Sequence, residues 1–83
     1  KQPSKKLKFT YKEQREYETI DNDIAALEEK LASIERQIAA NATNSVKLRE
    51  LLAEQEETQK TLDEKTERWV YLSELAEKIE GQE

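Results

Sequence analysis

The sequence predicts an all-α fold, a hairpin of two long helices packed as an antiparallel coiled coil. The chain has 83 residues, of which 40% are charged, with one glycine and one proline. That composition is typical of long helices rather than of turns and strands. Apolar residues recur at alternating spacings of three and four over residues 17–38, which is the seam of a coiled coil. The polar run at residues 41–45 interrupts this pattern and predicts the tip of the hairpin.

Along the chain we expect a basic linker, one helical domain and a short tail. A chain of this length has room for one domain only. Lysines surround Pro3 and Ser4 in residues 1–8, which offer little apolar surface to bury. We therefore place the helical hairpin domain at residues 9–80 and the tail at residues 81–83.

A short first helix is predicted over residues 11–19. Thr10 and Glu13 have the spacing of a capping box, in which each side chain bonds the other residue's backbone amide. Three poor helix formers then follow at residues 21–23. We expect a kink there, and a longer helix over residues 22–40.

The strict part of the seam lies mostly on this longer helix and predicts its buried face. Each member follows the previous one by three or four residues, so the side chains form one stripe along the helix. The predicted core residues are Tyr17, Ile20, Ile24, Leu27, Leu31, Ile34 and Ile38.

The second long helix is expected over residues 45–80, with a weaker seam that includes the polar layer Gln55 and Gln59. Asn41 is expected to end the preceding helix in a left-handed conformation. Folding about the tip pairs positions whose numbers sum to roughly 86, as in an antiparallel hairpin. The predicted core residues of this helix are Leu48, Leu52, Leu62, Trp69 and Leu72.

The base of the hairpin, where the chain enters and leaves, is richer in apolar residues than one partner helix can cover. Residues 69–72 place apolar groups on more than one helical face. We expect Leu7, Phe9 and Tyr11 to fold back and pack there. The alternative is that the leftover apolar face is a docking surface or a dimer contact.

Charge is distributed unevenly, with a basic N-terminal segment on an acidic rod. Residues 1–15 carry six basic side chains against Glu13 alone, whereas the rest of the chain carries eight basic and eighteen acidic side chains. Clustered positive charge with aromatic residues is typical of nucleic-acid binding. The candidate nucleic-acid-binding residues are Lys5, Lys6, Lys8, Lys12 and Arg15. The alternative is a solvated linker whose Phe9 and Tyr11 pack against the base.

The residue types argue against catalysis. The chain has no cysteine and no histidine, which removes thiolates, the commonest general base and the commonest zinc ligand. No glycine-rich loop is present to cradle phosphate. Adjacent acids such as Glu28 and Glu29 point to different faces of a helix. We expect no catalytic residue, no metal site and no cofactor in this chain.

Other features of the sequence bear on its location and state. No apolar run approaches the ~20 residues that span a bilayer, and no signal peptide is visible. We expect a cytoplasmic protein without membrane contact, and a monomer for the isolated chain. The abrupt polar start suggests a piece of a longer protein.

Residues 8–16 read Lys-Phe-Thr-Tyr-Lys-Glu-Gln-Arg-Glu, and this stretch resembles the opening of the C-terminal domain of Uup-type ABC-F ATPases. The matching residues are Tyr11, Lys12, Glu13, Gln14, Arg15 and Glu16. Arg68 and Trp69 match the Arg/Lys-Trp pair that the family carries near the base of its return helix. The resemblance covers about residues 7–78. The chain departs from the family at residues 19–21, where many members have a Leu-Pro break, and its tip is shorter than in many members.

The resemblance implies a parent protein with two ATP-binding cassettes and no membrane domain. ATP and Mg would bind in those cassettes, so the parent would be an ATPase and this domain would be non-catalytic. Proteins of this kind are similar to ribosome-associated translation factors, and the domain in Uup-like members is associated with DNA binding. The expected partners are therefore nucleic acid, either DNA or ribosomal RNA, and the parent's own cassettes. The alternative function is a protein-interaction or spacer coiled coil that self-associates.

Overall fold

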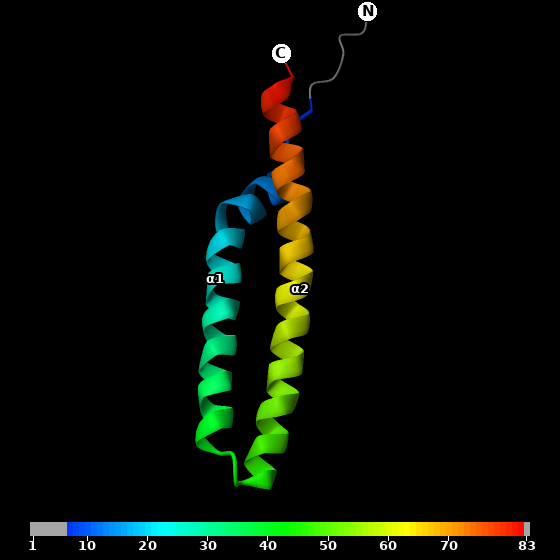
Figure 1. Ribbon diagram of the computed structural model, residues 1–83. Helices are drawn as coiled ribbons and strands as arrows, with labels where there is room; N and C mark the ends of the chain where they lie inside the picture. The colour runs from blue at the N-terminus through cyan, green and yellow to red at the C-terminus, as the bar shows by residue number, and fades with distance from the viewer. Residues whose placement is uncertain (1–6, 83) are drawn as a thin grey trace, which may run out of the picture.

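The computed structural model describes residues 7–82 and contains two helices, α1 (Tyr11–Ala40) and α2 (Ser45–Gly81). The helices lie side by side and run in opposite directions, with a short tip at one end (Figure 1). At 1.5 Å per residue, the 37 residues of α2 extend about 55 Å. The all-α hairpin expected from the sequence is confirmed.

Asparagine side chains define the tip. The backbone amide of Asn41 donates to the carbonyls of Gln37 and Ile38, and its side-chain amide donates to Gln37 at 2.8 Å, which ends α1. Asn44 caps α2 by accepting from the backbone amide of Lys47 at 3.0 Å. The expectation of a left-handed Asn41 is wrong, because its φ is −115°. The amide side chain satisfies the last carbonyls instead, so no left-handed residue is required.

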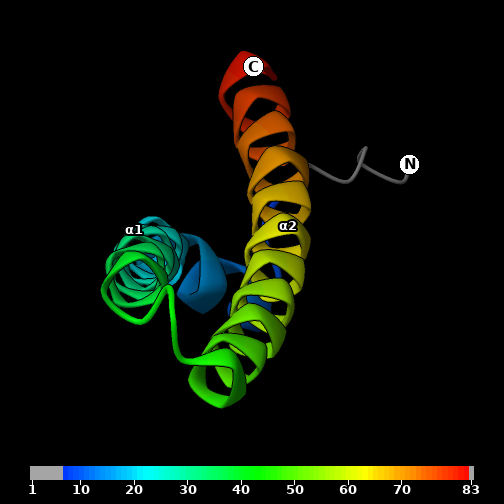
Figure 2. The ribbon, with the colours of Figure 1, turned by 60° about the horizontal axis from the view of Figure 1, so that its bottom comes forward.

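The N-terminal part of α1 is one helix with the remainder, although the sequence suggested separate helices over residues 11–19 and 22–40. The helix changes direction sharply near its start (Figure 1), and its first turns cross toward α2 (Figure 2). Thr19 lies at this bend, with its hydroxyl directed at the carbonyls of Arg15 (3.5 Å) and Glu16 (3.4 Å). A threonine hydroxyl that bonds back to the preceding turn bends a helix without breaking it.

The buried core is thin, as a two-helix rod requires. In the described part of the chain, α1 contributes Ile20 and Ile34, and α2 contributes Leu51, Leu72 and the polar residue Thr58. Most other members of the expected core are half-buried, namely Tyr17, Ile24, Leu27, Leu31, Ile38, Leu48 and Leu62, whereas Leu52 and Trp69 are exposed.

The seam of α2 follows a different phase from the one expected. Leu51 is 2% exposed, whereas the expected core residue Leu52 is 51% exposed, and Thr58 rather than Gln59 is buried. The observed phase includes Lys65, which lies three residues after Leu62 and four before Trp69. It therefore keeps an unbroken three-four alternation along α2. The expected phase passed through Thr66, Trp69 and Leu72, which are two successive spacings of three and would rotate the stripe away from α1.

Within residues 7–82, no helix is both long enough and apolar enough to cross a membrane. The bounds of α2 differ from the expected ones by one residue at its C-terminal end, where the helix includes Gly81. The cap residue Gln82 follows in extended backbone.

Candidate nucleic-acid interface

Glu13 caps the start of α1 and also bonds to α2. Glu13 accepts from the backbone amide of Thr10 at 3.0 Å, and the Thr10 hydroxyl accepts from the amide of Glu13 at 3.1 Å, which completes the capping box. The second carboxylate oxygen of Glu13 accepts from the hydroxyl of Tyr71 at 2.6 Å. The start of the first helix is therefore fixed against the second helix by a charge-assisted hydrogen bond.

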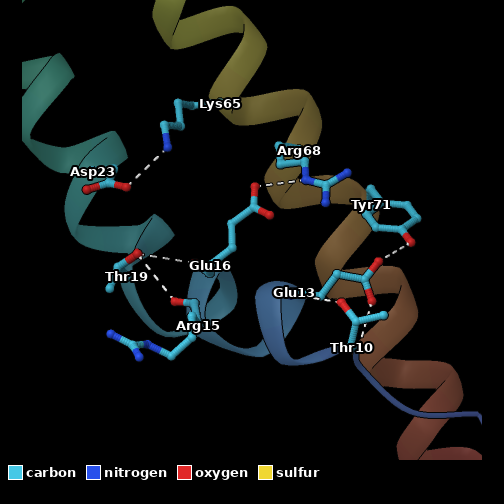
Figure 3. A network of polar contacts seen from close by, with 9 residues as sticks. All are labelled: Thr10, Glu13, Arg15, Glu16, Thr19, Asp23, Lys65, Arg68 and Tyr71. Carbon is cyan, nitrogen blue, oxygen red and sulfur yellow. Dashed lines mark hydrogen bonds and ion pairs between the residues drawn. The ribbon is translucent and has the colours of Figure 1, made fainter.

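Two further contacts continue this connection between the helices (Figure 3). Arg68 Nε donates to Glu16 at 2.8 Å, and Lys65 Nζ donates to Asp23 at 3.2 Å. The guanidinium of Arg68 also lies over the ring of Tyr71, 4.8 Å from its centroid. Acids of α1 thus face cations of α2 at the base of the hairpin.

The register of these three pairs changes across the bend in α1, as the sums of their residue numbers show. The numbers of Glu13 and Tyr71 sum to 84, as do those of Glu16 and Arg68, but those of Asp23 and Lys65 sum to 88. Between the last two pairs α1 advances by seven residues and α2 by three. The bend takes up the difference, because the first turns of α1 cross α2 instead of running along it.

The same contacts shift the pKa values of three groups. The hydrogen bond from Tyr71, followed by the one from the Thr10 backbone, lowers the pKa of the Glu13 carboxyl. The carboxylate of Glu13 raises the pKa of the Tyr71 hydroxyl. The hydrogen bond to Glu16 raises the pKa of the Arg68 guanidinium. Each shift favours the charge state in which the contact forms.

The segment before α1 folds back along the end of α2 only in part. The backbone amide of Leu7 donates to Gln82 Oε1 at 2.8 Å, and Gln82 Nε2 donates to the Leu7 carbonyl. Phe9 packs on the ring of Tyr17 within α1, with ring centroids 5.2 Å apart. The expectation that Tyr11 packs at the base is wrong, since 77% of its surface is exposed. Tyr11 is the first residue of α1, and its hydroxyl accepts from Arg15 on the exposed side of the helix.

The candidate basic residues of the described chain are all exposed. Lys8, Lys12 and Arg15 lie on the surface, and we refer to these three as the basic surface. In residues 7–82, none of the three forms an ion pair with an acidic side chain. Lys5 and Lys6, the other two candidates, lie outside the described residues. Of the nearby acids, Glu16 is paired with Arg68, which partly offsets its charge, whereas Glu13 bonds the neutral hydroxyl of Tyr71 and keeps its negative charge.

The base also exposes apolar surface, which includes Trp69, a residue that we expected in the core. Trp69 is 39% exposed, and Val70 and Tyr71 are 41% and 44% exposed. Trp69 occupies its place in the three-four pattern, but the bent start of α1 contacts α2 at this level through the neighbouring residues Arg68 and Tyr71. The pattern alone could not reveal this exposure, because it describes a straight helix.

The middle of the rod is acidic, unlike the basic surface at the base. A groove of about 810 Å³ lies between the helices there, with Leu31 at its apolar side and acids of α2 along much of its wall. These acids are Glu56, Glu57, Asp63, Glu64 and Glu67. Such a surface repels phosphates along the middle of the rod. Among the described residues, no group of three or more possible ligands is placed to hold a metal ion.

Comparison with known proteins identifies related sequences. A family model described as the ABC transporter C-terminal domain matches residues 8–74. The uncharacterized ABC transporter ATP-binding protein YfmR of Bacillus subtilis (strain 168) is 41% identical over 77 residues, which cover 93% of this chain. The chain spans 12% of the length of that relative. No solved structure matches the chain.

Proposed function

Because the chain belongs to the ABC transporter C-terminal domain family, we propose that it is a non-catalytic accessory domain that binds nucleic acid through the base of its hairpin. The observation that supports this most directly is the basic surface. Lys8, Lys12 and Arg15 are exposed and without acidic partners in the described chain, while neighbouring acids bond to α2. Lysine and arginine in this state attract phosphates by displacing their counterions.

The acidic rod supports a short contact rather than a long one. Beyond the bend, acids outnumber bases along both helices, and the mid-rod groove is lined by carboxylates. Phosphates that reach past the base would meet repulsion. The proposed contact is therefore confined to a few residues. We include Lys5 and Lys6 in it, because they precede Lys8 in the sequence. Its target is DNA or ribosomal RNA.

The proposal assigns ATP chemistry to a longer parent protein. The B. subtilis relative is named an ATP-binding protein, and this chain spans 12% of its length. ATP and Mg²⁺ would bind in the cassettes of such a parent, and those cassettes are the domain's other partners. We further propose that the parent is a cytoplasmic ABC-F type ATPase and that the isolated domain is a monomer.

The test is binding of labelled nucleic acid to two variants of equal charge. In the first, Lys5, Lys6, Lys8, Lys12 and Arg15 are all changed to Gln. In the control, the basic residues changed to Gln are Lys30, Arg36, Lys47, Arg49 and Lys60. Fluorescence anisotropy should show steeply salt-dependent binding for the unchanged protein and the control, and loss of binding for the first variant. Equal binding by the two variants would overturn the proposal.

Protein interaction is a second candidate function, favoured by one observation. Trp69 and Val70 expose apolar surface side by side on α2, 39% and 41% respectively, and exposed apolar surface is a feature of interaction sites. A self-associating hairpin would bury this surface. Sedimentation equilibrium tests self-association, because a protein that stays monomeric across a wide concentration range would contradict it. If a dimer forms, Trp69→Gln should dissociate it.

A further inference from the structure

Tyr11 presents an aromatic ring to solvent beside the basic surface. It is 77% exposed, the largest value among the exposed large hydrophobic residues of the described chain. Packing around the base uses Phe9, whose ring lies against Tyr17, and Tyr71, whose hydroxyl bonds to Glu13. Tyr11 is therefore not needed to fill the core, and at least one face of its ring is accessible to solvent.

A cation holds this ring in place. Arg15 Nη1 donates to the Tyr11 hydroxyl at 2.8 Å, and the Arg15 guanidinium carbon lies 5.8 Å from the ring centroid. The two residues are four apart on α1 and so lie on one side of the helix, and Lys12 is three residues before Arg15. Lys8 lies on the exposed segment just before the helix. A fixed ring is thus flanked by positive charge.

We propose that Tyr11 stacks on an unpaired nucleobase while the basic surface contacts the phosphates on either side of it. The domain would then bind single-stranded nucleic acid in preference to a duplex, an inference that rests on the proposed function. An aromatic ring stacks readily on an unpaired base, because every base has a π-face, and proteins that bind single strands combine such rings with a basic groove. In a duplex, both faces of an internal base are covered by its neighbours.

The size of the site agrees with one or two nucleotides. Four residues of helix separate Tyr11 from Arg15, a distance of about 6 Å, compared with 3.4 Å per nucleotide along one strand of a duplex. Beyond Glu16, which is paired with Arg68, the next acids along α1 are Glu18 and Asp21, and both are exposed. They would oppose the second strand and the closely spaced phosphates of a duplex laid along the rod.

The test compares Tyr11→Ala and Tyr11→Phe with the unchanged protein. The probes are a fluorescein-labelled DNA single strand, the RNA strand of the same sequence, and the DNA duplex. Tyr11→Ala should weaken binding of a single strand by about tenfold, the effect of losing one stacked base, and leave duplex binding unchanged. Tyr11→Phe should retain binding of the single strand, because it keeps the ring. An upfield shift of the Tyr11 ring protons on binding is expected as a direct sign of stacking.

The outcomes separate this inference from the proposed function. Unchanged binding by Tyr11→Ala, or a preference for duplex, would overturn stacking, and the proposed function would stand if neutralising the five basic residues still abolished binding. Absence of binding to all three probes by the unchanged protein would overturn both. Circular dichroism checks that Tyr11→Ala remains helical, and Tyr11→Gln serves as a second variant without a ring if it does not.

Discussion

Tyr71 donates its hydroxyl hydrogen to the carboxylate of Glu13 at 2.6 Å, although 58 residues separate the two in sequence. Glu13 also completes the capping box with Thr10, so one side chain begins α1 and fastens it to α2. Arg68 bonds Glu16 one turn away. These polar contacts join the bent start of α1 to the base of the hairpin, and Tyr11, Lys12 and Arg15 remain exposed.

Removing this link should lower stability in a graded way. Glu13→Ala removes the cap and the link, whereas Tyr71→Phe removes the link alone, so we expect both to lower the melting temperature, with the larger decrease for Glu13→Ala. The double variant should lose less than the sum of the two, because the residues share one interaction. Thermal unfolding followed by circular dichroism measures this. Glu28→Ala, at an exposed position of α1, is the control. Equal melting of Tyr71→Phe and the unchanged protein would contradict the link.

The same link predicts how stability depends on pH. The folded state lowers the pKa of Glu13, so the carboxyl binds a proton less readily when folded than when unfolded. Its contribution is present above the ordinary glutamate pKa of about 4.3 and is lost as pH falls through the lower folded value. Urea midpoints measured across this acidic range should fall less steeply for Glu13→Gln than for the unchanged protein. Parallel curves would show that Glu13 makes no such contribution.

At alkaline pH the partner residue should have the opposite effect. The folded state raises the pKa of the Tyr71 hydroxyl through its bond to Glu13. The contribution of that bond is therefore present below the ordinary tyrosine pKa of about 10 and is lost as pH rises through the higher folded value. As pH rises from the ordinary tyrosine pKa to the higher folded value, the free energy of unfolding should fall less for Tyr71→Phe than for the unchanged protein. Spectrophotometric titration should find Tyr71 ionising above the ordinary tyrosine pKa.

The phase of the α2 seam is tested by two adjacent leucines. Leu51→Ala should lower the free energy of unfolding by about 2 kcal/mol or more, because it leaves a cavity beside α1. Leu52→Ala should change it by no more than about 0.5 kcal/mol, since Leu52 is 51% exposed. Urea unfolding of the two variants gives the comparison. A larger effect at Leu52 would reinstate the phase first expected from the sequence.

The buried Thr58 should be replaceable by an apolar residue of the same shape. Thr58 is 3% exposed in the middle of the rod, so its hydroxyl is desolvated on folding. Thr58→Val should leave stability unchanged or raise it by up to about 1 kcal/mol. The same change at the half-buried neighbour Thr61 is not equivalent, because the Thr61 hydroxyl donates to the Glu57 carbonyl at 3.1 Å. A marked loss for Thr58→Val in urea unfolding would mean that its hydroxyl holds the register of the helices.

The sequence predicted those parts of the fold that depend on local pattern. The capping residues Thr10 and Glu13, the tip at residues 41–45 and the stripe through Ile20 and Ile34 follow from spacing and residue type alone. The phase of α2 was less certain, because Leu51 and Leu52 are both leucine and a three-four pattern passes through either. Only the continuation to Leu72 distinguishes them.

The candidate site was harder to predict, because it depends on the bend. The charges of Lys8, Lys12 and Arg15 are visible in the sequence, but the engagement of Glu13 and Glu16 with α2 requires the register of the two helices. The exposure of Trp69 depends on the path of α1 before Thr19, where Glu13 and Glu16 bond to Tyr71 and Arg68 on either side of it. The three-four pattern describes a straight helix and does not contain this bend, and it begins at Tyr17, so it does not place Tyr11.

Mapping of amide chemical shifts during titration with nucleic acid tests the central claim most directly, because it separates the base of the hairpin from the tip. The account predicts salt-sensitive changes at Lys8, Tyr11, Lys12 and Arg15, with Val46 and Lys47 unaffected. Changes that gather at Val46 and Lys47, or along the acidic groove at Glu56 and Asp63, would contradict it.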